Sequence, residues 1–227
     1  EPSDGILPRP VPFSVVYEDD DILVVDKPAD TPIHPSIGNY ENTLANALAY
    51  RFASRGEHFV FRAVNRLDRD TTGLLLIAKH KISGAFLSAM TAKKEIRREY
   101  LAIVSGKPEE YGTIDLPIAR KDGSTIERCI DMEHGEHAVT HYRCLDYRDD
   151  LDCSLVLLRL ETGRTHQIRV HMKAIGHPLL GDFLYNPDYR FIGRQALHSY
   201  TVAFRHPITG EAMEFTAPMP EDFSFFY

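Results

Sequence analysis

The chain has 227 residues, 43% of them hydrophobic, and a formal net charge of −7. This length suits one elaborated domain or two small ones, and we favour one, over residues 13–227. Its apolar runs are far shorter than the roughly 20 residues of a membrane helix, so a soluble protein is expected. The three cysteines lack C-x-x-C spacing, which indicates a reducing, cytoplasmic setting without a zinc site.

The negative charge argues against a nucleic-acid partner until its distribution is considered. Residues 62–120 carry 11 lysines and arginines against 7 acidic residues, and residues 163–205 carry 6 against 2. Basic side chains that neutralise phosphates are therefore concentrated in two segments. The alternative is chance variation along the chain, because sequence does not show which side chains share a face.

The first third of the chain predicts an arm, a hairpin and a helix. Residues 1–12 are rich in proline, which indicates an extended arm. Residues 15–17 and 22–26 read as two strands around an acidic turn. A proline-rich loop then continues to about residue 42, and Thr43 is placed to cap a helix.

The remainder alternates strands with two helices. The strands are expected at residues 74–79, 99–105, 138–146, 154–161 and 197–204. One helix is expected near residues 81–93, with Phe86, Leu87 and Met90 on its apolar side, and another from Thr165 to Gly176. The sum predicts an α+β fold with a large, mainly antiparallel sheet.

Residues 62–73 form a polar loop followed at once by an apolar strand. Such a loop can aim the Asp68 carboxylate from a rigid scaffold, while Arg62, Arg66 and Arg69 hold an anionic substrate around it. An ordinary turn is the alternative, because this segment is rich in good turn formers.

Residues 161–172 lead from a strand into a helix. His166 and His171 are five apart, so they lie well apart around a helix and predict no metal site. Arg164 and Arg169 can each engage phosphate or a carboxylate, or serve as a solvated side chain and a structural ion pair.

A basic cluster at residues 93–98 precedes Tyr100 at the start of a strand. The tyrosine ring can stack on a nucleobase, and such stacking is worth about 1–3 kcal/mol per base. The cations of the cluster can bind phosphate at the same time. The alternative is a core tyrosine beside a solvated helix end.

Taken together and in order, these segments resemble the RluA-type pseudouridine synthases. The residues that carry the resemblance are 65–73 (NRLDRDTTG), 98–102 (REYLA), 163–171 (GRTHQIRVH), 176–182 (GHPLLGD) and 197–198 (LH). The match spans residues 15–218, and it implies a curved antiparallel sheet with flanking helices and a central catalytic cleft.

The resemblance also implies roles for individual residues. Asp68 falls on the essential aspartate, Tyr100 on the tyrosine that stacks on the target base, and Arg169 on the arginine that pairs with the aspartate. Arg66 falls on the position that helps displace the target nucleotide, and Leu197 on an apolar residue of the pocket.

One position departs from the family pattern, and several others are expected to contact RNA. The family usually has histidine where this chain has Asn65, so we expect altered loop contacts or RNA preference. The residues to which we assign contact with RNA or substrate are Arg62, Asn65, Arg66, Arg69, Thr72, Arg98, Arg164 and Leu197.

Uridine isomerisation involves no net redox change and no energy input, so we expect no cofactor and no metal. It requires an ionised carboxylate in a dry pocket, and an opposing cation such as Arg169 would favour that charged form. Extruding a uridine from a helix costs a few kcal/mol.

Two other functions are compatible with parts of the sequence. A non-catalytic RNA-binding protein of the same fold has no reason to combine Asp68, Tyr100 and Arg169. A carboxylate-dependent hydrolase would need a second acid or base, for which Asp70 is the nearest candidate.

The partner expected is structured RNA, either ribosomal or transfer RNA. Many family members carry a small N-terminal RNA-binding domain, which we expect this chain to lack. We further expect a monomer without an obligate protein partner.

Overall fold

The computed structural model describes residues 5–227 and divides into two compact units. Unit 1 comprises the described residues up to Arg97 together with Ser199–Pro218, and unit 2 comprises Arg98–His198 with Met219–Tyr227. Both contain helices and strands, so the predicted α+β class is confirmed. The single catalytic domain of residues 13–227 stays a prediction.

The predicted N-terminal arm falls partly on residues 1–4, which lie outside the described residues. Residues 5–13 contain no helix or strand. They are tied to the body of unit 1, because the N–H of Arg9 donates to the carbonyl of Asn46 at 3.1 Å.

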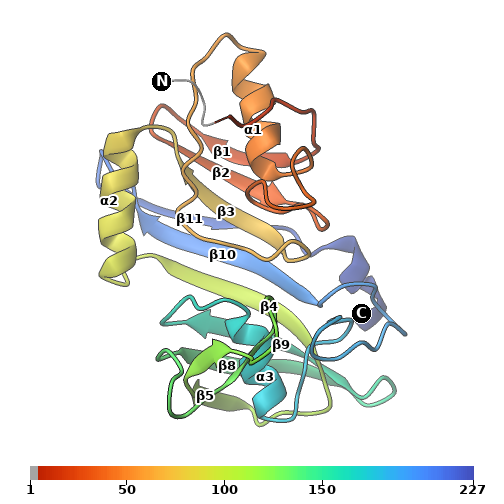
Figure 1. Ribbon diagram of the computed structural model, residues 1–227. Coiled ribbons are helices and arrows are strands. Elements are labelled where there is room, and N and C mark those ends of the chain that lie inside the picture. Colours follow the sequence, from red (N-terminus) through yellow and green to blue (C-terminus); the bar gives the residue numbers. More distant parts are fainter. Residues whose placement is uncertain (1–4) are drawn as a thin grey trace. The chain divides into compact units, whose positions relative to one another are not determined.

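Unit 1 contains a sheet whose strands are drawn in Figure 1. Its strands are β1 (Ser14–Glu18), β2 (Ile22–Lys27), β3 (Thr72–Ala78), β10 (Leu197–Arg205), whose first two residues belong to unit 2, and β11 (Ala212–Thr216). Their order is β1-β2-β3-β10, and β11 pairs with β10. The predicted hairpin is confirmed, since β1 and β2 pair in antiparallel fashion.

Strands β2 and β3 form the centre of unit 1. Every residue of β3 is buried, and alternate residues such as Val24 and Leu76 pack into one apolar cluster with Leu87. Continuous apolar runs are what strands covered on both faces require. The rigid strands β2 and β3 fix the position of the loop that leads into β3 at Thr72.

Two helices belong to unit 1, α1 (Leu44–Ala53) and α2 (Lys81–Ala92). Thr43 caps α1 as predicted, and it forms a capping box with Asn46. The predicted apolar side of α2 is wrong for Phe86, which is 51% exposed. The reason is the 100° step between neighbouring helical residues, because Leu87 is the one that faces the sheet.

Unit 2 contains an antiparallel sheet of order β4-β9-β8-β5. Its strands are β4 (Arg97–Ser105), whose first residue belongs to unit 1, β9 (Cys153–Leu160), β8 (Val139–Arg148) and β5 (Tyr111–Asp115). A separate hairpin joins β6 (Ile118–Arg120) to β7 (Arg128–Ile130), and the helical segments are α3 (Gln167–Ala174) and the 3₁₀ turn η1 (Glu221–Phe226). The short elements β5, β6, β7, β11 and η1 were not predicted.

Helix α3 is buried on several sides, as predicted. Its residue Val170 packs with Ala138 and Tyr185. On another face, His171 lies between the hydroxyl of Thr140 at 2.9 Å and the carbonyl of Leu116 at 2.8 Å. Burial lowers the pKa of His171, so the ring stays neutral and serves as a structural hydrogen-bonding group.

Within the described part of the chain, no helix has the combination of length and apolar character required to cross a membrane.

Candidate active site

The loop that carries Asp68 is attached to β3 before its turn, and the turn itself is closed by a backbone hydrogen bond. Before the turn, the N–H of Val64 donates to the carbonyl of Leu76 at 2.8 Å. Within the turn, the N–H of Thr71 donates to the carbonyl of Asp68 at 3.1 Å, just before β3 begins. Asp68 is partly buried. Its carboxylate is thus carried by a short turn on a rigid strand.

Lys27 anchors the same turn from within. It is fully buried, and its ammonium donates to the carbonyls of Pro28 and Thr31, each at 2.9 Å, and of Arg69 at 2.7 Å. These carbonyls surround the charge with strong acceptors. Lys27 therefore holds the residue next to Asp68, a positioning role that sequence reasoning missed. The only sequence signal for this role was the position of Lys27 directly before Pro28, where the proline-rich loop begins.

The three arginines of the loop have different surroundings. Arg66 is exposed, and Arg62 is partly buried and donates to the carbonyl of Val60 at 3.0 Å. The Nε of Arg69 donates to Asp30 at 2.6 Å. Both side chains of this last pair are more than half exposed, so the pair contributes about 0–1 kcal/mol. Arg69 can exchange its carboxylate partner for a phosphate at little cost.

Asn65 is 7% exposed and lies against β3. Its Oδ1 accepts from the N–H of Leu76 at 3.2 Å, while its Nδ2 has no hydrogen-bond partner among residues 5–227. A buried donor without an acceptor costs about 1–3 kcal/mol. The loop therefore holds one buried donor without a partner among the described residues. Thr72, another predicted contact residue, is also buried.

Gly73, the second residue of β3, has a backbone conformation that requires glycine. Its φ is +104°, and a Cβ atom at this position would lie 2.2 Å from the carbonyl oxygen of Ser199 in β10. Close packing of β3 and β10 is therefore possible only without a side chain here.

Tyr100 and Leu197 are both buried, at 5% exposure each, and both belong to unit 2. Tyr100 lies in β4 opposite Leu158 of β9. Arg98, two residues earlier, is partly buried. The ring is therefore largely shielded from solvent. The base-stacking role stays a prediction.

Arg169 lies on α3 and is 2% exposed. Its Nε donates to Asp182 Oδ2 at 2.6 Å and its Nη2 donates to Asp182 Oδ1 at 2.8 Å. The Asp182 carboxylate also accepts from the N–H groups of Leu184 and Tyr185. This bidentate pair fixes the guanidinium in one plane.

Aromatic rings cover the same guanidinium. Its Cζ atom lies 5.0 Å from the ring centre of Tyr185 and 5.5 Å from that of Phe183. Burial raises the pKa of Tyr185 to about 12, so the ring stays neutral. Sequence reasoning gave no role to Asp182, although it lies within a segment that carries the family resemblance.

The turn into α3 is held by Gln167. Its Oε1 accepts from the hydroxyl of Thr162 at 2.8 Å and from the N–H of Arg164 at 3.0 Å. His166, just before it, has a positive φ of 57°. Arg164 is exposed and pairs with Glu136. The motif at residues 163–171 thus builds a tight strand-to-helix turn.

The predicted site residues fall into both units. Those of unit 1 lie on the Asp68 loop and at the start of β3: Arg62, Asn65, Arg66, Asp68, Arg69 and Thr72. Those of unit 2 are Arg98, Tyr100, Arg164, Arg169 and Leu197. The predicted pairing of Asp68 with Arg169 joins the two units and stays a prediction.

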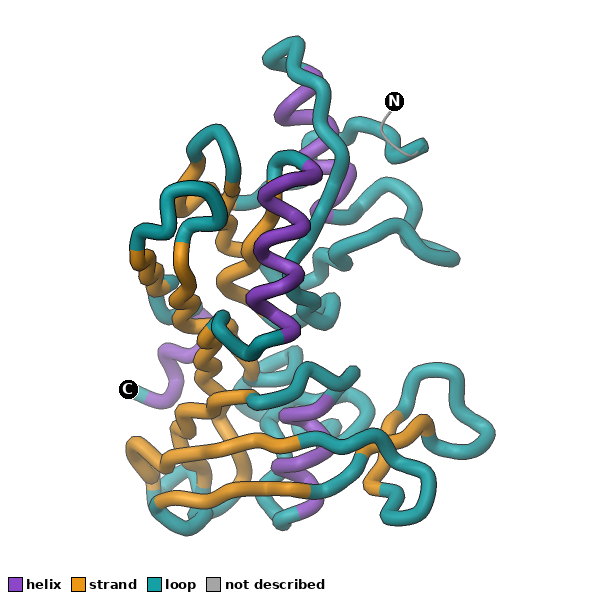
Figure 2. Tube along the Cα trace, turned by 90° about the vertical axis from the view of Figure 1, so that its left-hand side faces the viewer, coloured by secondary structure: helices purple, strands orange, loops and turns teal. Residues whose placement is uncertain are grey.

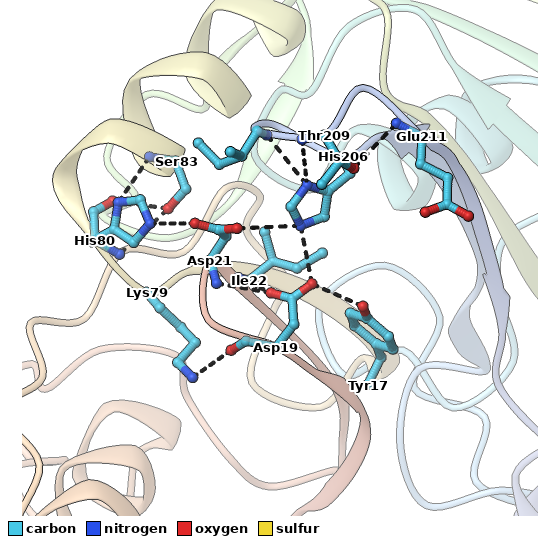
Figure 3. Close-up of polar contacts among 11 residues, drawn as sticks. Tyr17, Asp19, Asp21, Ile22, Lys79, His80, Ser83, His206, Thr209 and Glu211 are labelled. Atoms are coloured by element: carbon cyan, nitrogen blue, oxygen red, sulfur yellow. Dashed lines mark hydrogen bonds and ion pairs between the residues drawn. The ribbon is translucent and has the colours of Figure 1, made fainter.

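A second polar cluster in unit 1 brings together groups that can bind metals (Figure 3). The ligand atoms of Asp19, Asp21 and His206 lie within 4.8 Å of one another. However, His206 Nδ1 accepts from the N–H groups of Ile208 at 3.3 Å and Thr209 at 3.1 Å. A metal on Nε2 would need the proton on Nδ1, which these two donors oppose. We assign no metal to this cluster.

Hydrogen bonding accounts for the cluster. His206 Nε2 lies 3.0 Å from Asp19 Oδ2, and Asp19 Oδ1 accepts from the N–H groups of Asp21 and Ile22, each at 2.8 Å. Burial alone would raise the pKa of Asp19, but these hydrogen bonds and one from Tyr17 hold it below its ordinary value. The cluster joins the β1–β2 turn to the β10–β11 turn.

Comparison with known families identifies the chemistry. The protein family described as RNA pseudouridylate synthase matches residues 21–174 of this chain. The chain belongs to this family. It is an enzyme that isomerises uridine in RNA to pseudouridine, and the expected RluA-type resemblance is confirmed.

Relatives support the same assignment. The uncharacterized RNA pseudouridine synthase YjbO of Bacillus subtilis (strain 168) is 43% identical over 223 residues, covering 98% of this chain and 78% of that protein. The ribosomal large subunit pseudouridine synthase D of Zymomonas mobilis is 43% identical over 234 residues, covering 97% and 73%. The solved human RNA pseudouridylate synthase domain containing 1 has a TM-score of 0.78 at 30% identity, covering 93% and 85%.

Proposed function

We propose that this synthase modifies uridine in the RNA of the large ribosomal subunit, with Asp68 as the catalytic carboxylate. The observation that carries the choice of ribosomal RNA is the similarity to the Zymomonas protein, which spans 97% of this chain. Transfer RNA is the alternative substrate class.

The reaction exchanges one glycosidic bond for another. The bond from uracil N1 to ribose C1′ breaks, the base turns, and C5 forms the new bond to C1′. N1 gains a proton and C5 loses one, so atoms and electrons balance without a cofactor. Asp68 either attacks the base or the sugar or removes a proton from the sugar, and each route requires its ionised form.

The setting of Asp68 supports this role. Its loop is bonded to β3 on one side and held by the buried Lys27 ammonium on the other. A catalytic group contributes most when its geometry is fixed before the substrate binds. We propose that Arg169 pairs with Asp68 in the catalytic state and keeps it charged, while Asp182 keeps the guanidinium in place.

Tyr100 would hold the freed uracil. A stacked ring permits rotation in the ring plane, which a set of fixed hydrogen bonds would hinder. Tyr100 is buried in β4, so its ring is held in a fixed position.

Extraction of the target nucleotide is assigned to Arg66. Its exposed side chain projects from the same loop as Asp68, so it can occupy the space that an extruded uridine leaves. The other arginines of the loop would meet backbone phosphates, and binding should therefore weaken steeply with salt.

The contacts of Asp70 argue against a carboxylate-dependent hydrolase, for which Asp70 was the candidate second acid or base. Its Oδ1 accepts from the backbone N–H of Asp30 at 3.1 Å, which gives this carboxylate a role in tying two loops together. We further propose that the protein acts as a monomer in the cytoplasm.

The test is a map of pseudouridine across total RNA by carbodiimide labelling and primer extension, in cells with and without this protein. We expect loss of one or a few sites in large-subunit RNA, restored by wild type but not by Asp68→Asn. Loss confined to transfer RNA would replace the proposed substrate. An unchanged map would favour a non-catalytic RNA-binding role or a second enzyme that modifies the same sites.

A further inference from the structure

A groove runs along one side of α2 in unit 1, outside the turn that carries Asp68. Its volume is about 450 Å³. One wall is the extended stretch of residues 62–64, and the other is the face of α2 that includes Lys81, Gly84 and Ser88. Figures 1 and 2 both show the extended stretch passing beside this helix.

The groove is open because the helix presents small side chains to it. Gly84 lies where a Cβ atom would already be 3.4 Å from Cδ of Arg62 and 3.6 Å from Cβ of Ala78. Ala85 and Ser88 continue the same face. Larger residues at these positions would fill the space between helix and loop.

Charge in the groove has one sign. Arg62 and Lys81 line it, whereas none of its lining residues is acidic. Lys81 is the first residue of α2, and that helix has no acidic residue in its first turn. The positive end of the α2 dipole lies at Lys81, so a cation there is unfavourable for the helix itself. An anionic ligand at this end would be stabilised both by the Lys81 ammonium and by the helix dipole.

We infer that this groove binds the sugar-phosphate backbone of a single-stranded RNA segment adjoining the target uridine. This inference rests on the proposed function, which makes RNA the ligand. The lining from Lys81 to Thr91 spans eleven helical residues, about 15 Å along the helix axis, which suits a few nucleotides of one strand.

The groove leads toward the catalytic loop. Val64 lines it, and Asp68 follows four residues later, at most about 14 Å along the chain. A strand whose phosphates lie beside α2 can therefore continue to the nucleotide at Asp68. The groove would recognise backbone and not base sequence, because its polar groups are cations and hydroxyls.

The test places a negative charge in the groove and compares it with the same charge beside it. Ser88 lines the groove, whereas Ala89 lies outside it, and both residues are exposed on α2. The variants Ser88→Glu and Ala89→Glu are therefore matched in helix, charge and exposure. Both are made in the full chain, with melting curves to confirm folding.

Binding of a labelled, mixed-sequence, single-stranded RNA of 15 nucleotides is measured by fluorescence anisotropy at several salt concentrations. We expect Ser88→Glu to weaken binding about five- to tenfold at low salt, with Ala89→Glu close to wild type. Lys81→Ala should lower the slope of log K against log salt by about 0.7, the value for one phosphate contact of a single strand.

If the two glutamate variants weaken RNA binding equally, or if neither weakens it, the inference is overturned. A protein partner would then be the alternative ligand of the groove. The assay requires no turnover, so it can be repeated in an Asp68→Asn background. If Asp68→Asn still forms pseudouridine while the difference between the glutamates persists, the catalytic assignment fails and the groove stands.

Discussion

Asp68 in unit 1 and Asp182 in unit 2 show how differently one residue type is used in this protein. Asp68 is partly buried on a short turn. Asp182 is fully buried, binds Arg169 through both carboxylate oxygens and accepts two backbone N–H groups. Asp182 is saturated with partners, which suits a positioning role. Asp68, by contrast, is the carboxylate to which we assign catalysis, and its short turn leaves it only partly buried.

The largest expected effect is on catalysis at Asp68. Asp68→Asn is nearly isosteric, so we expect unchanged RNA binding and an unchanged melting temperature, with a rate of product formation reduced at least about 10⁴-fold, or more than about 5 kcal/mol. Single-turnover conversion of a labelled transcript measures the rate. A rate less than about 10⁴-fold below that of the wild type in a purified preparation would remove Asp68 from the central role.

The next largest effect is on stability at Asp182. Asp182→Ala leaves the Arg169 guanidinium buried without its carboxylate, and breaking such a pair costs about 3–5 kcal/mol. Urea denaturation measures the free energy of unfolding.

A matched control exists in the same unit. Arg194 pairs with Asp222 at 2.6 Å, but the Asp222 side chain is 44% exposed. Asp222→Ala should therefore cost only about 1 kcal/mol, since water reaches the site. Equal losses for the two variants would show that burial does not distinguish the pairs.

A third prediction concerns the support of Asp68. Lys27→Met keeps the shape of the side chain but removes the donor for three carbonyls, one of them on Arg69. We expect a loss of about 2–3 kcal/mol in stability, because buried acceptors lose a charged partner. If Lys27 positions the catalytic turn, kcat should fall more than KM rises. Lost stability with an unchanged kcat would leave Lys27 a purely structural role.

The smallest expected effect is at Asn65. The Nδ1 atom of a histidine can accept from the N–H of Leu76 as Asn65 Oδ1 does, so Asn65→His should change stability by less than about 1 kcal/mol. Asn65→Leu removes that acceptor and should cost about 1–3 kcal/mol. Thermal melts of both variants measure the difference. A larger loss in the histidine variant would show that the site is too tight for the family residue.

Sequence patterns predicted the long elements well. The strands that became β2, β3, β4, β8, β9 and β10 are apolar runs long enough to be recognised, and Thr43 capped its helix as expected. The short strands β6 and β7 have three residues each, too few for a periodic pattern. Phe86 was misplaced because helical periodicity gives the spacing of apolar residues but not which of two neighbours meets the core.

The sequence by itself determined the family and the candidate catalytic residues, because chemistry depends on side-chain type and the motifs keep those types in order. The long strands followed as well, since their hydrophobic periodicity is local. Only the tertiary structure showed that Asp182 is the buried partner of Arg169 and that Lys27 lies beneath the Asp68 turn. These contacts join residues 13 and 42 positions apart. Contacts of that kind are decided by packing, which no local pattern records.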